Sequence, residues 1–245
     1  MLNVIEGRNP VLEALKSGRP ISKVSIAKNV ERHSVIGQII HLAEVNSVPV
    51  DYVERQAIDR QSETGAHQGV MAFAAAKDYV DLDELLAIPA QKNEPAFFIV
   101  LDGVEDPHNL GAILRTADAA GAHGIIVREK RAVGLTPIVE KASAGAIEYV
   151  PVARVANISQ TIDILKKKNI WVVGIDQDAA TNYTKIDYRP ATAFIIGGEG
   201  KGVADLVKKN CDFTTFIPMK GKISSLNASV AAAVVMYEVL HQRTP

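Results

Sequence analysis

The sequence predicts an α/β protein with a small amino-terminal α/β domain and a larger carboxyl-terminal domain built on a parallel sheet. Short apolar segments alternate with segments of helical spacing along nearly all of the 245 residues. In the second half, several apolar segments have no polar face, which is typical of parallel strands covered by helices. An acidic stretch at 77–93 separates the two parts.

Residues 1–76 predict a module of roughly half the usual domain size. Asn9 followed by Pro10 is a typical helix start, and apolar residues recur at helical spacing through 33–46. The expected elements are helices at 9–15 and 33–46 and strands at 23–27, 49–53 and 70–75. We expect 77–93 to be a linker, because it is acidic, contains Pro89 and has one weak helix near 82–86.

Residues 94–245 predict the larger domain, in which strands and helices alternate to the end of the chain. Apolar runs indicate strands at 97–101, 124–127, 149–152, 171–175, 192–196 and 213–217. Helical spacing indicates helices at 109–120, 136–146, 158–168, 203–209 and 225–242. Polar loops therefore follow several strands, and the carboxyl ends of parallel strands are where open α/β sheets bind ligands.

Composition limits the classes of protein and the kinds of partner. Hydrophobic residues make up 47% of the chain, which supports a sizeable core, and the single cysteine, Cys211, excludes an internal disulfide framework. No signal peptide and no apolar run near ~18 residues is found, so we expect a cytoplasmic protein without a membrane segment. The net charge of −1 excludes nucleic-acid binding by bulk charge. RNA contacts would need local patches such as Lys220 and Lys222, or 166–168, although we favour a solvated helix end for 166–168.

The first polar loop, Asp106-Pro-His-Asn109, leads into a helix that carries Arg115. Pro107 restricts Asp106 to an extended conformation, and Asn109 is expected to be the helix N-cap or a local hydrogen-bonding anchor. Arg115 falls early in the helix, where its guanidinium could grip a phosphate. The alternative is a surface arginine paired with a nearby acid, for which the candidates are Asp102, Glu105 and Asp118.

Two further loops follow the fifth and sixth strands of this domain. The glycine-rich segment 195–202 is not a P-loop, because Lys201 precedes Gly202 rather than Ser or Thr, and it also lacks the dinucleotide spacing. Its backbone N–H groups could still hold a small ligand, although a plain tight turn also explains the glycines. In the third loop, Ser225 or Asn227 could simply cap the helix that follows. The Asp102, Asp106 and His108 group lacks a complete ligand set, so no metal is expected.

Together these segments resemble the signature motifs of the SpoU (TrmH-like) family of SPOUT RNA ribose 2′-O-methyltransferases. The first motif corresponds to Asp106-Pro-His-Asn109 with Arg115-Thr-Ala117. The second corresponds to Gly197-Gly-Glu-Gly-Lys-Gly202. The third corresponds to Ile217-Pro-Met219 with Ser224-Ser-Leu-Asn227. The resemblance covers about 94–245.

The amino-terminal segment, including Gly65-Ala-His-Gln-Gly-Val70, is similar to the L30e-like substrate-binding domain of longer family members. This arrangement most resembles the bacterial enzymes that methylate a guanosine in 23S ribosomal RNA. The resemblance implies a deep trefoil knot, S-adenosylmethionine bound in a bent form, and a homodimer whose active site is completed across the interface.

The resemblance also implies residue roles. The catalytic group would be Asn109, Arg115, Glu199, Ser225 and Asn227. The backbone around Gly197, Ile217 and Leu226 would hold S-adenosylmethionine. Arg115 is poorly suited to act as a general base, because a guanidinium stays protonated. We therefore favour an electrostatic role for Arg115.

Two rival functions remain open on sequence grounds. A transfer-RNA ribose methyltransferase of the same family is one, although that type generally lacks the amino-terminal domain. A non-catalytic RNA-binding module is the other. Methylation at pyrimidine carbon-5 is disfavoured, since it needs a cysteine nucleophile and Cys211 is expected to be structural. His67 and Gln68 could contact RNA or stabilise their loop.

Overall fold

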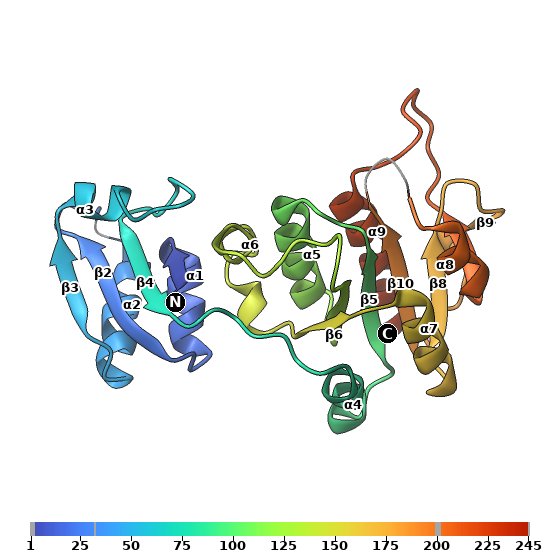
Figure 1. Ribbon diagram of the computed structural model, residues 1–245, viewed down its shortest axis with the longest axis horizontal. Coiled ribbons are helices and arrows are strands. Elements are labelled where there is room, and N and C mark those ends of the chain that lie inside the picture. Colours follow the sequence, from blue (N-terminus) through green and yellow to red (C-terminus); the bar gives the residue numbers. More distant parts are fainter. Residues whose placement is uncertain (1–2, 32, 199–201, 245) are drawn as a thin grey trace. The chain divides into compact units, whose positions relative to one another are not determined.

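The computed structural model describes residues 3–31, 33–198 and 202–244, which form two compact units. Unit 1 comprises Met1–Asp78 and Gly134–Tyr149, and unit 2 comprises Tyr79–Val133 and Val150–Pro245. Figure 1 labels the elements of both units along the chain. No helix within the described residues is long and apolar enough to cross a membrane.

Unit 1 contains a four-stranded mixed sheet in the order β1-β4-β2-β3. Strands β1 (Asn3–Glu6) and β2 (Ile21–Ala27) run antiparallel to β4 (Val70–Ala74), and β3 (Val50–Val53) runs parallel to β2. Residues of β4 alternate between the two faces, as expected for a strand. Val70 and Ala72 join the core formed with helices α1 (Arg8–Lys16) and α2 (Ser34–Val45), while Met71 and Phe73 pack with Ile58 of α3 (Arg55–Asp59).

The later segment of unit 1 contains α6 (Pro137–Ala142) and the 3₁₀ turn η1 (Ala146–Glu148). A buried ion cluster joins it to the amino-terminal residues. The Arg19 guanidinium donates to Glu140 at 3.1 Å and to Glu148 at 2.7 Å, and Lys77 Nζ lies 2.9 Å from Glu148. The Arg19, Glu140 and Glu148 side chains are at most 7% exposed, so 134–149 is held to unit 1 by buried charges.

Unit 2 contains a seven-stranded parallel sheet, which confirms the fold class expected for the second half of the chain. Its order is β7-β6-β5-β10-β8-β11-β9. The strands are β5 (Phe97–Asp102), β6 (Gly124–Arg128), β7 (Val152–Val155), β8 (Trp171–Ile175), β9 (Thr181–Asn182), β10 (Thr192–Gly197) and β11 (Phe213–Phe216). Strands β5 and β10 are fully buried along most of their length, which explains their unbroken apolar sequences.

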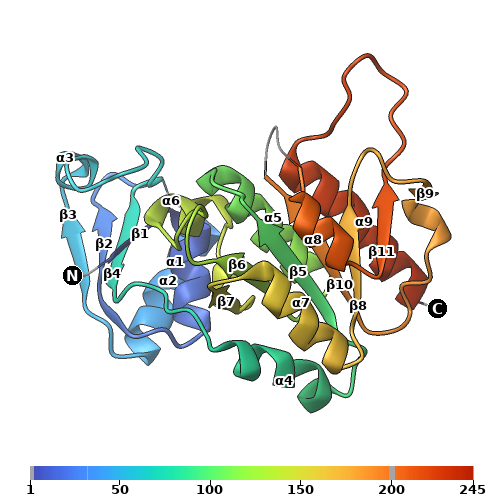
Figure 2. The same ribbon diagram turned by 45° about the vertical axis from the view of Figure 1, so that its right-hand side comes forward.

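Helices cover both faces of the unit 2 sheet (Figure 2). Alternate residues such as Phe98 and Val100 join a core with α4 (Leu82–Lys92), α7 (Ile158–Lys167) and α8 (Asp205–Asn210). On the other face, the Phe97 ring packs edge-on against Phe194 and lies 5.5 Å from the guanidinium carbon of Arg243, in α9 (Ala228–Arg243). Helix α5 (Pro107–Ala119) packs against α9. The sheet is thus the central layer of unit 2.

Some expected elements differ from those observed. The strand expected at 149–152 is β7 at Val152–Val155, because Ala146–Glu148 form a 3₁₀ turn first. The helix expected to reach 146 ends at Ala142, since Ala144 and Gly145 both have positive φ. Within 77–93, α4 buries Leu85 and Leu86 in the core of unit 2. Strands β1 and β9 and helix α3 were not expected from the sequence.

Candidate functional site

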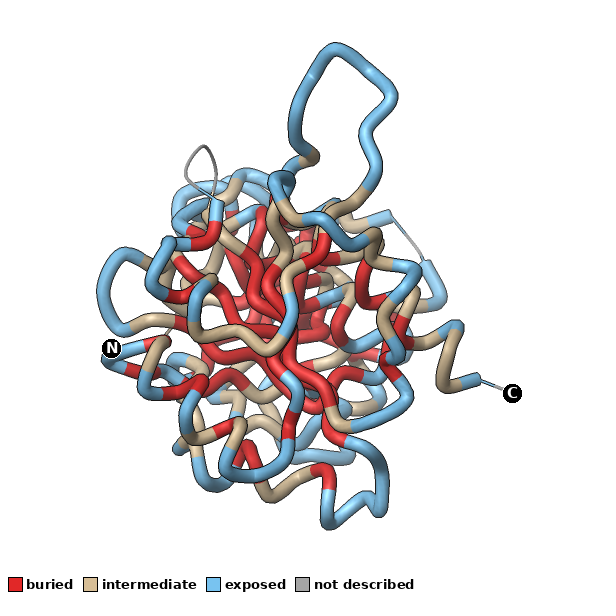
Figure 3. Tube along the Cα trace, turned by 90° about the vertical axis from the view of Figure 1, so that its right-hand side faces the viewer, coloured by how far each residue is buried: buried red, intermediate tan, exposed pale blue. Residues whose placement is uncertain are grey.

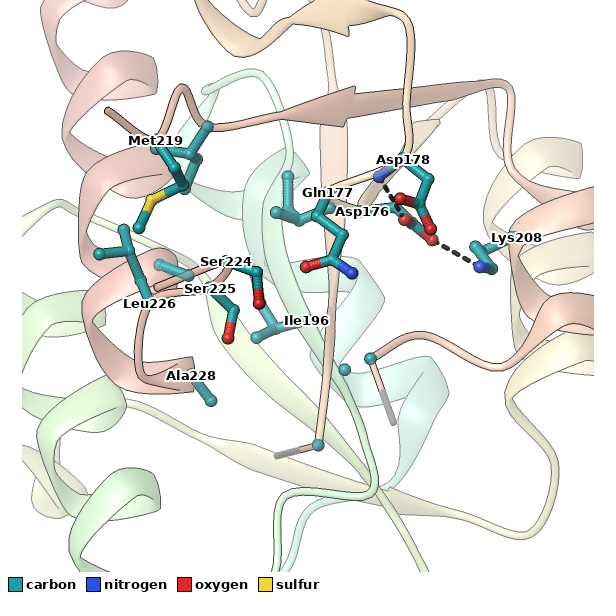
Figure 4. A pocket seen from close by; sticks show the side chains of 16 residues that line it. Asp176, Gln177, Asp178, Ile196, Lys208, Met219, Ser224, Ser225, Leu226 and Ala228 are labelled. Atoms are coloured by element: carbon teal, nitrogen blue, oxygen red, sulfur yellow. Dashed lines mark hydrogen bonds and ion pairs between the residues drawn. The ribbon is translucent and has the colours of Figure 1, made fainter. Parts of the chain in front are cut away.

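Loops from the carboxyl ends of β8, β10 and β11 surround a cavity of about 370 Å³ in unit 2, here called the first cavity (Figure 4). All three strands are parallel, so their carboxyl ends meet at one edge of the sheet. Part of the wall is the long loop after β11, whose residues 218–225 are exposed (Figure 3). The cavity is lined by Ile175, Asp176, Gln177, Asp178, Ile196, Gly197, Gly198, Gly202, Lys208, Ile217, Met219, Ser224, Ser225, Leu226, Ala228 and Ala231.

Two glycines bring three backbone segments together at the floor of this cavity. A side chain at Gly197 would overlap the Gly202 carbonyl group, and one at Gly198 would overlap the Gly103 carbonyl oxygen. The Gly198 N–H donates to the Asp102 carbonyl at 3.0 Å. The glycines are therefore required for close backbone approach rather than for an ordinary turn.

The first cavity has one charged side and one apolar side. Lys208 Nζ lies 2.6 Å from Asp176 Oδ2, and the Asp178 N–H donates to Asp176 Oδ1 at 2.9 Å. Burial raises the pKa of Asp176, but these hydrogen bonds outweigh it and leave that pKa below its ordinary value. Figure 4 shows Met219 and Leu226 across the cavity from this ion pair. Such a pocket can hold a small ligand that carries an apolar ring and charged groups.

A second cavity of about 710 Å³ adjoins the first and shares Gly198, Gly202 and Ala228 with it. Its most buried charged group is Asp102, which is 5% exposed. The Asp102 carboxylate accepts hydrogen bonds from Arg128 Nη1 at 3.1 Å and from the Ala204 N–H at 3.2 Å. The remaining lining residues are Gly103, Val104, Glu105, Asp106, Asn109, Arg131, Val203 and Asp205.

Helix α5 begins at the edge of the second cavity. Asp106 is extended, as the following proline predicts, and its carboxylate caps the helix by accepting the His108 N–H at 2.9 Å. Asn109 is therefore not the N-cap. Its side chain is instead buried in the first turn, at 4% exposure, and lines the second cavity.

The structure brings most of the expected site residues to these two cavities. Gly197, Ile217, Leu226 and Ser225 line the first cavity, and Asn109 lines the second. Asn227 Oδ1 caps α9 by accepting the Ser229 and Val230 N–H groups at 2.9 and 3.4 Å. Arg115 is exposed on α5 and lines neither cavity of its own chain. Glu199 lies outside the described residues.

Two other residues singled out from the sequence have local structural contacts. Burial raises the pKa of Cys211 to about 11, and its thiol donates to the Val207 carbonyl at 3.3 Å. His67 is buried, with Nε2 2.7 Å from Asp59 Oδ1, while its Nδ1 accepts the Gly69 N–H at 3.0 Å. Cys211 is thus a poor nucleophile, and His67 stabilises its loop.

Sequence reasoning missed several polar residues of the two cavities. Asp176 and Arg128 lie at the carboxyl ends of β8 and β6, so the rule that selected the other loops could also have selected them. Arg131, three residues after β6, lies in a loop that the same rule selects, whereas Lys208 gave no such signal because it belongs to helix α8. No group of three or more His, Cys, Asp or Glu residues suited to a metal occurs in the described part of the chain.

Comparisons with known proteins agree with this geometry. Residues 96–237 match the family described as SpoU rRNA Methylase, and residues 4–80 match the family described as RNA 2′-O ribose methyltransferase substrate binding. The Bacillus subtilis (strain 168) protein YacO, assigned by name to TrmH family tRNA/rRNA methyltransferases, is 50% identical over 239 residues. This alignment covers 98% of the chain and 95% of the relative.

Two solved structures resemble the chain over nearly its whole length. The SpoU methyltransferase AviRb of Streptomyces viridochromogenes, in complex with AdoMet, has a TM-score of 0.81 at 27% identity. The match covers 99% of this chain and 90% of that one. The AdoMet-bound rRNA methyltransferase of Sinorhizobium meliloti has a TM-score of 0.75 at 26% identity, covering 98% and 87%. The chain therefore belongs to the SpoU (TrmH) family of RNA 2′-O-ribose methyltransferases.

Proposed function

We propose that the chain transfers the methyl group of S-adenosylmethionine to the ribose 2′-hydroxyl of a guanosine in 23S ribosomal RNA. The observation that carries this proposal is the contact of two cavities at Gly198, Gly202 and Ala228. One cavity contains the residues expected to bind the donor, and the other contains Asn109. A donor and an acceptor bound side by side can react in line without diffusing.

The first cavity suits the donor. S-adenosylmethionine supplies an electrophilic methyl group on a sulfonium, and the solved structures from Streptomyces viridochromogenes and Sinorhizobium meliloti contain it. In this chain, the backbone around Gly197, Ile217 and Leu226 would hold the donor, with Leu226 and Met219 against its adenine. The Asp176–Lys208 pair supplies the charged groups on the opposite side of the cavity.

The acceptor side needs alignment of the ribose hydroxyl and removal of its proton. We propose that Asn109, Ser225 and Asn227 position the ribose, together with Glu199. Arg115 would stabilise the developing alkoxide by charge, since its guanidinium stays protonated and cannot accept the proton. The ribose oxygen takes the methyl group as the methyl–sulfur bond breaks, S-adenosylhomocysteine leaves, and the hydroxyl proton passes to solvent water.

A homodimer explains why Arg115 lines neither cavity of its own chain. We propose that each Arg115 completes the active site of the partner chain. The exposed face of α9 supports an interface, because Val230 and Tyr237 are 47% and 52% exposed on it. We also propose that the carboxyl-terminal elements form the family's trefoil knot around a bent donor.

The amino-terminal domain favours a ribosomal target. We assign residues 1–76 to RNA substrate binding and 94–245 to catalysis, joined through 77–93, in an enzyme that acts in the cytoplasm. The match to a substrate-binding family over 4–80 supports this assignment, as does full-length similarity to an rRNA methyltransferase. Members that methylate transfer RNA generally lack such a domain.

Radiolabelled methyl transfer to transcripts of 23S ribosomal RNA and of transfer RNA tests the proposal. We expect label in the ribosomal transcript, at one ribose located by nuclease mapping. Label in transfer RNA alone would replace the ribosomal target with the transfer-RNA alternative. If the chain binds S-adenosylmethionine but transfers no methyl group to either RNA, the remaining alternative is a non-catalytic RNA-binding module.

A further inference from the structure

The acids of the second cavity are mostly engaged by groups of the protein itself. Asp102 accepts from Arg128 and from the Ala204 N–H, and Asp106 accepts from the N–H of His108. Asp205 lies 3.2 Å from Lys208 Nζ. Three of the four acids that line the cavity are thus held by a cation or an N–H group, and Glu105 is the one acid without such a contact among the described residues.

Arg131 is the cation of this cavity that has no partner in the described part of the chain. Among the described residues, none forms a hydrogen bond or ion pair with its exposed side chain. Its backbone is in the left-handed region, with φ 58°, which costs free energy for a residue other than glycine. Its segment is fixed on both sides, since Glu129 N–H donates to the Val155 carbonyl and Val133 N–H to the Val104 carbonyl. An arginine held in this conformation at a cavity is a candidate functional residue.

Arg128 lies at the same cavity and is held in place by a buried acid. Its Nη1 donates to Asp102, while 36% of the side chain remains exposed. A guanidinium has five donors, so the bond to Asp102 orients the group without using all of them. Arg128, oriented by Asp102, and Arg131, whose backbone segment is anchored, thus both line the second cavity.

We infer that Arg128 and Arg131 bind RNA phosphate groups next to the target ribose, which makes the second cavity the acceptor-nucleotide site. This inference rests on the proposed function. Guanidinium groups match phosphate oxygens in a bidentate fork, and this geometry fixes the position of a sugar–phosphate unit. A phosphate held by these arginines would keep its ribose in the same cavity, which meets the donor cavity at Gly198 and Ala228.

The inference predicts opposite effects for two side chains that line the second cavity. Arg131→Gly removes the guanidinium and also relieves the left-handed strain, so the variant should fold at least as stably as the wild type. Its KM for a 23S ribosomal RNA transcript should rise about tenfold, as expected for loss of a charge-assisted hydrogen bond. Glu105→Gln removes a negative charge near the phosphate and should lower that KM. Arg131→Lys should lie between wild type and Arg131→Gly.

The measurements are steady-state methyl transfer to the 23S transcript, calorimetric titration with S-adenosylmethionine alone, and the salt dependence of RNA binding. We expect Arg131→Gly to leave donor affinity unchanged and to reduce the slope of log affinity against log salt by about one. Arg189→Ala is the matched control, since Arg189 is an exposed arginine of unit 2 that lines neither cavity.

The inference is overturned if Arg131→Gly changes neither KM nor the salt slope, or if donor affinity falls as much as RNA affinity. The inference is also overturned if Arg189→Ala loses as much RNA affinity as Arg131→Gly. In that case the loss would reflect the net charge of the protein rather than a contact made by Arg131. Absence of methyl transfer by the wild-type chain to any RNA is a different result, which removes the proposed function itself.

Discussion

At the scale of single residues, Gly198 sets the shape of both cavities, because its backbone contacts the Gly103 carbonyl and it lines each cavity. We expect Gly198→Ala to weaken S-adenosylmethionine binding by about tenfold or more, since the added methyl group must displace the backbone. Isothermal calorimetry measures the change. Gly37→Ala is the control, because a side chain there meets nothing within 4 Å. Equal donor affinity in Gly198→Ala and wild type would contradict this view of the loop.

Two substitutions of Arg115 distinguish stabilisation by charge from proton transfer. Arg115→Ala should lower kcat by about 10²–10³-fold, the usual effect of losing a transition-state charge. Arg115→Lys retains the charge and should keep measurable turnover. If Arg115→Lys is as inactive as Arg115→Ala while RNA binding is unchanged, electrostatic stabilisation is not a sufficient explanation.

Asn227 has both a structural and a proposed catalytic role, and two substitutions distinguish them. Asn227→Ala removes the cap of α9 and should lower the free energy of unfolding by about 1 kcal/mol. Asn227→Asp keeps a capping oxygen, so thermal unfolding should stay near wild type while methyl transfer falls. An Asn227→Asp variant with normal activity would leave Asn227 with the capping role alone.

At the scale of secondary-structure elements, α9 carries the proposed dimer interface. The double variant Val230→Asp with Tyr237→Asp should be monomeric by analytical ultracentrifugation, because two charges enter an apolar face. Activity should then fall by about two orders of magnitude, since each site loses the partner's arginine. Val45→Asp, on an exposed position of α2, is the control. A fully active monomeric variant would refute the shared site.

The ion cluster of unit 1 predicts a pH-dependent stability. Arg19→Ala should destabilise unit 1 by about 3–5 kcal/mol near neutral pH, because Glu140 and Glu148 then stay buried without their main partner. Burial already raises the pKa of Glu140 above its ordinary 4.5, and Arg19 opposes that shift. Without Arg19 the pKa rises further, so protonation should relieve the loss as the pH falls toward 4.5.

Chemical unfolding at several pH values measures this difference. Lys28→Ala is the control, since its ion pair with Glu54 is exposed and should contribute little. A loss of stability in Arg19→Ala that grows as the pH falls would contradict the sign of the expected shift.

Most elements could be predicted because their apolar spacing is regular. Strand β8 falls on the expected residues 171–175, and the apolar run at 97–101 is β5 without its last residue. The apolar run at 149–152 predicted a strand that begins too early. Val150 and Val152 are both buried, but Val150 lies in a bend and only Val152 belongs to strand β7. Strand β9, with two residues, is too short to give a periodic signal.

At the scale of the whole molecule, sequence spacing could identify loops but not their neighbours. Gly197, Ile217 and Leu226 are grouped by a sheet order in which β8 lies between β10 and β11, and local sequence does not encode that order. For the same reason, the buried link between Arg19 and Glu140, 121 residues apart, could not be predicted. Long-range contacts of this kind depend on the assembled core rather than on local propensity.

Methylation of a ribose in large-subunit ribosomal RNA is the central claim, and a ribose-methylation map tests it most directly. The map compares ribosomal and transfer RNA from cells with and without this protein. We expect one 2′-O-methylguanosine of 23S ribosomal RNA to be lost and every transfer RNA to keep its pattern. Loss of a ribose methyl group from a transfer RNA, with ribosomal RNA unchanged, would contradict the claim.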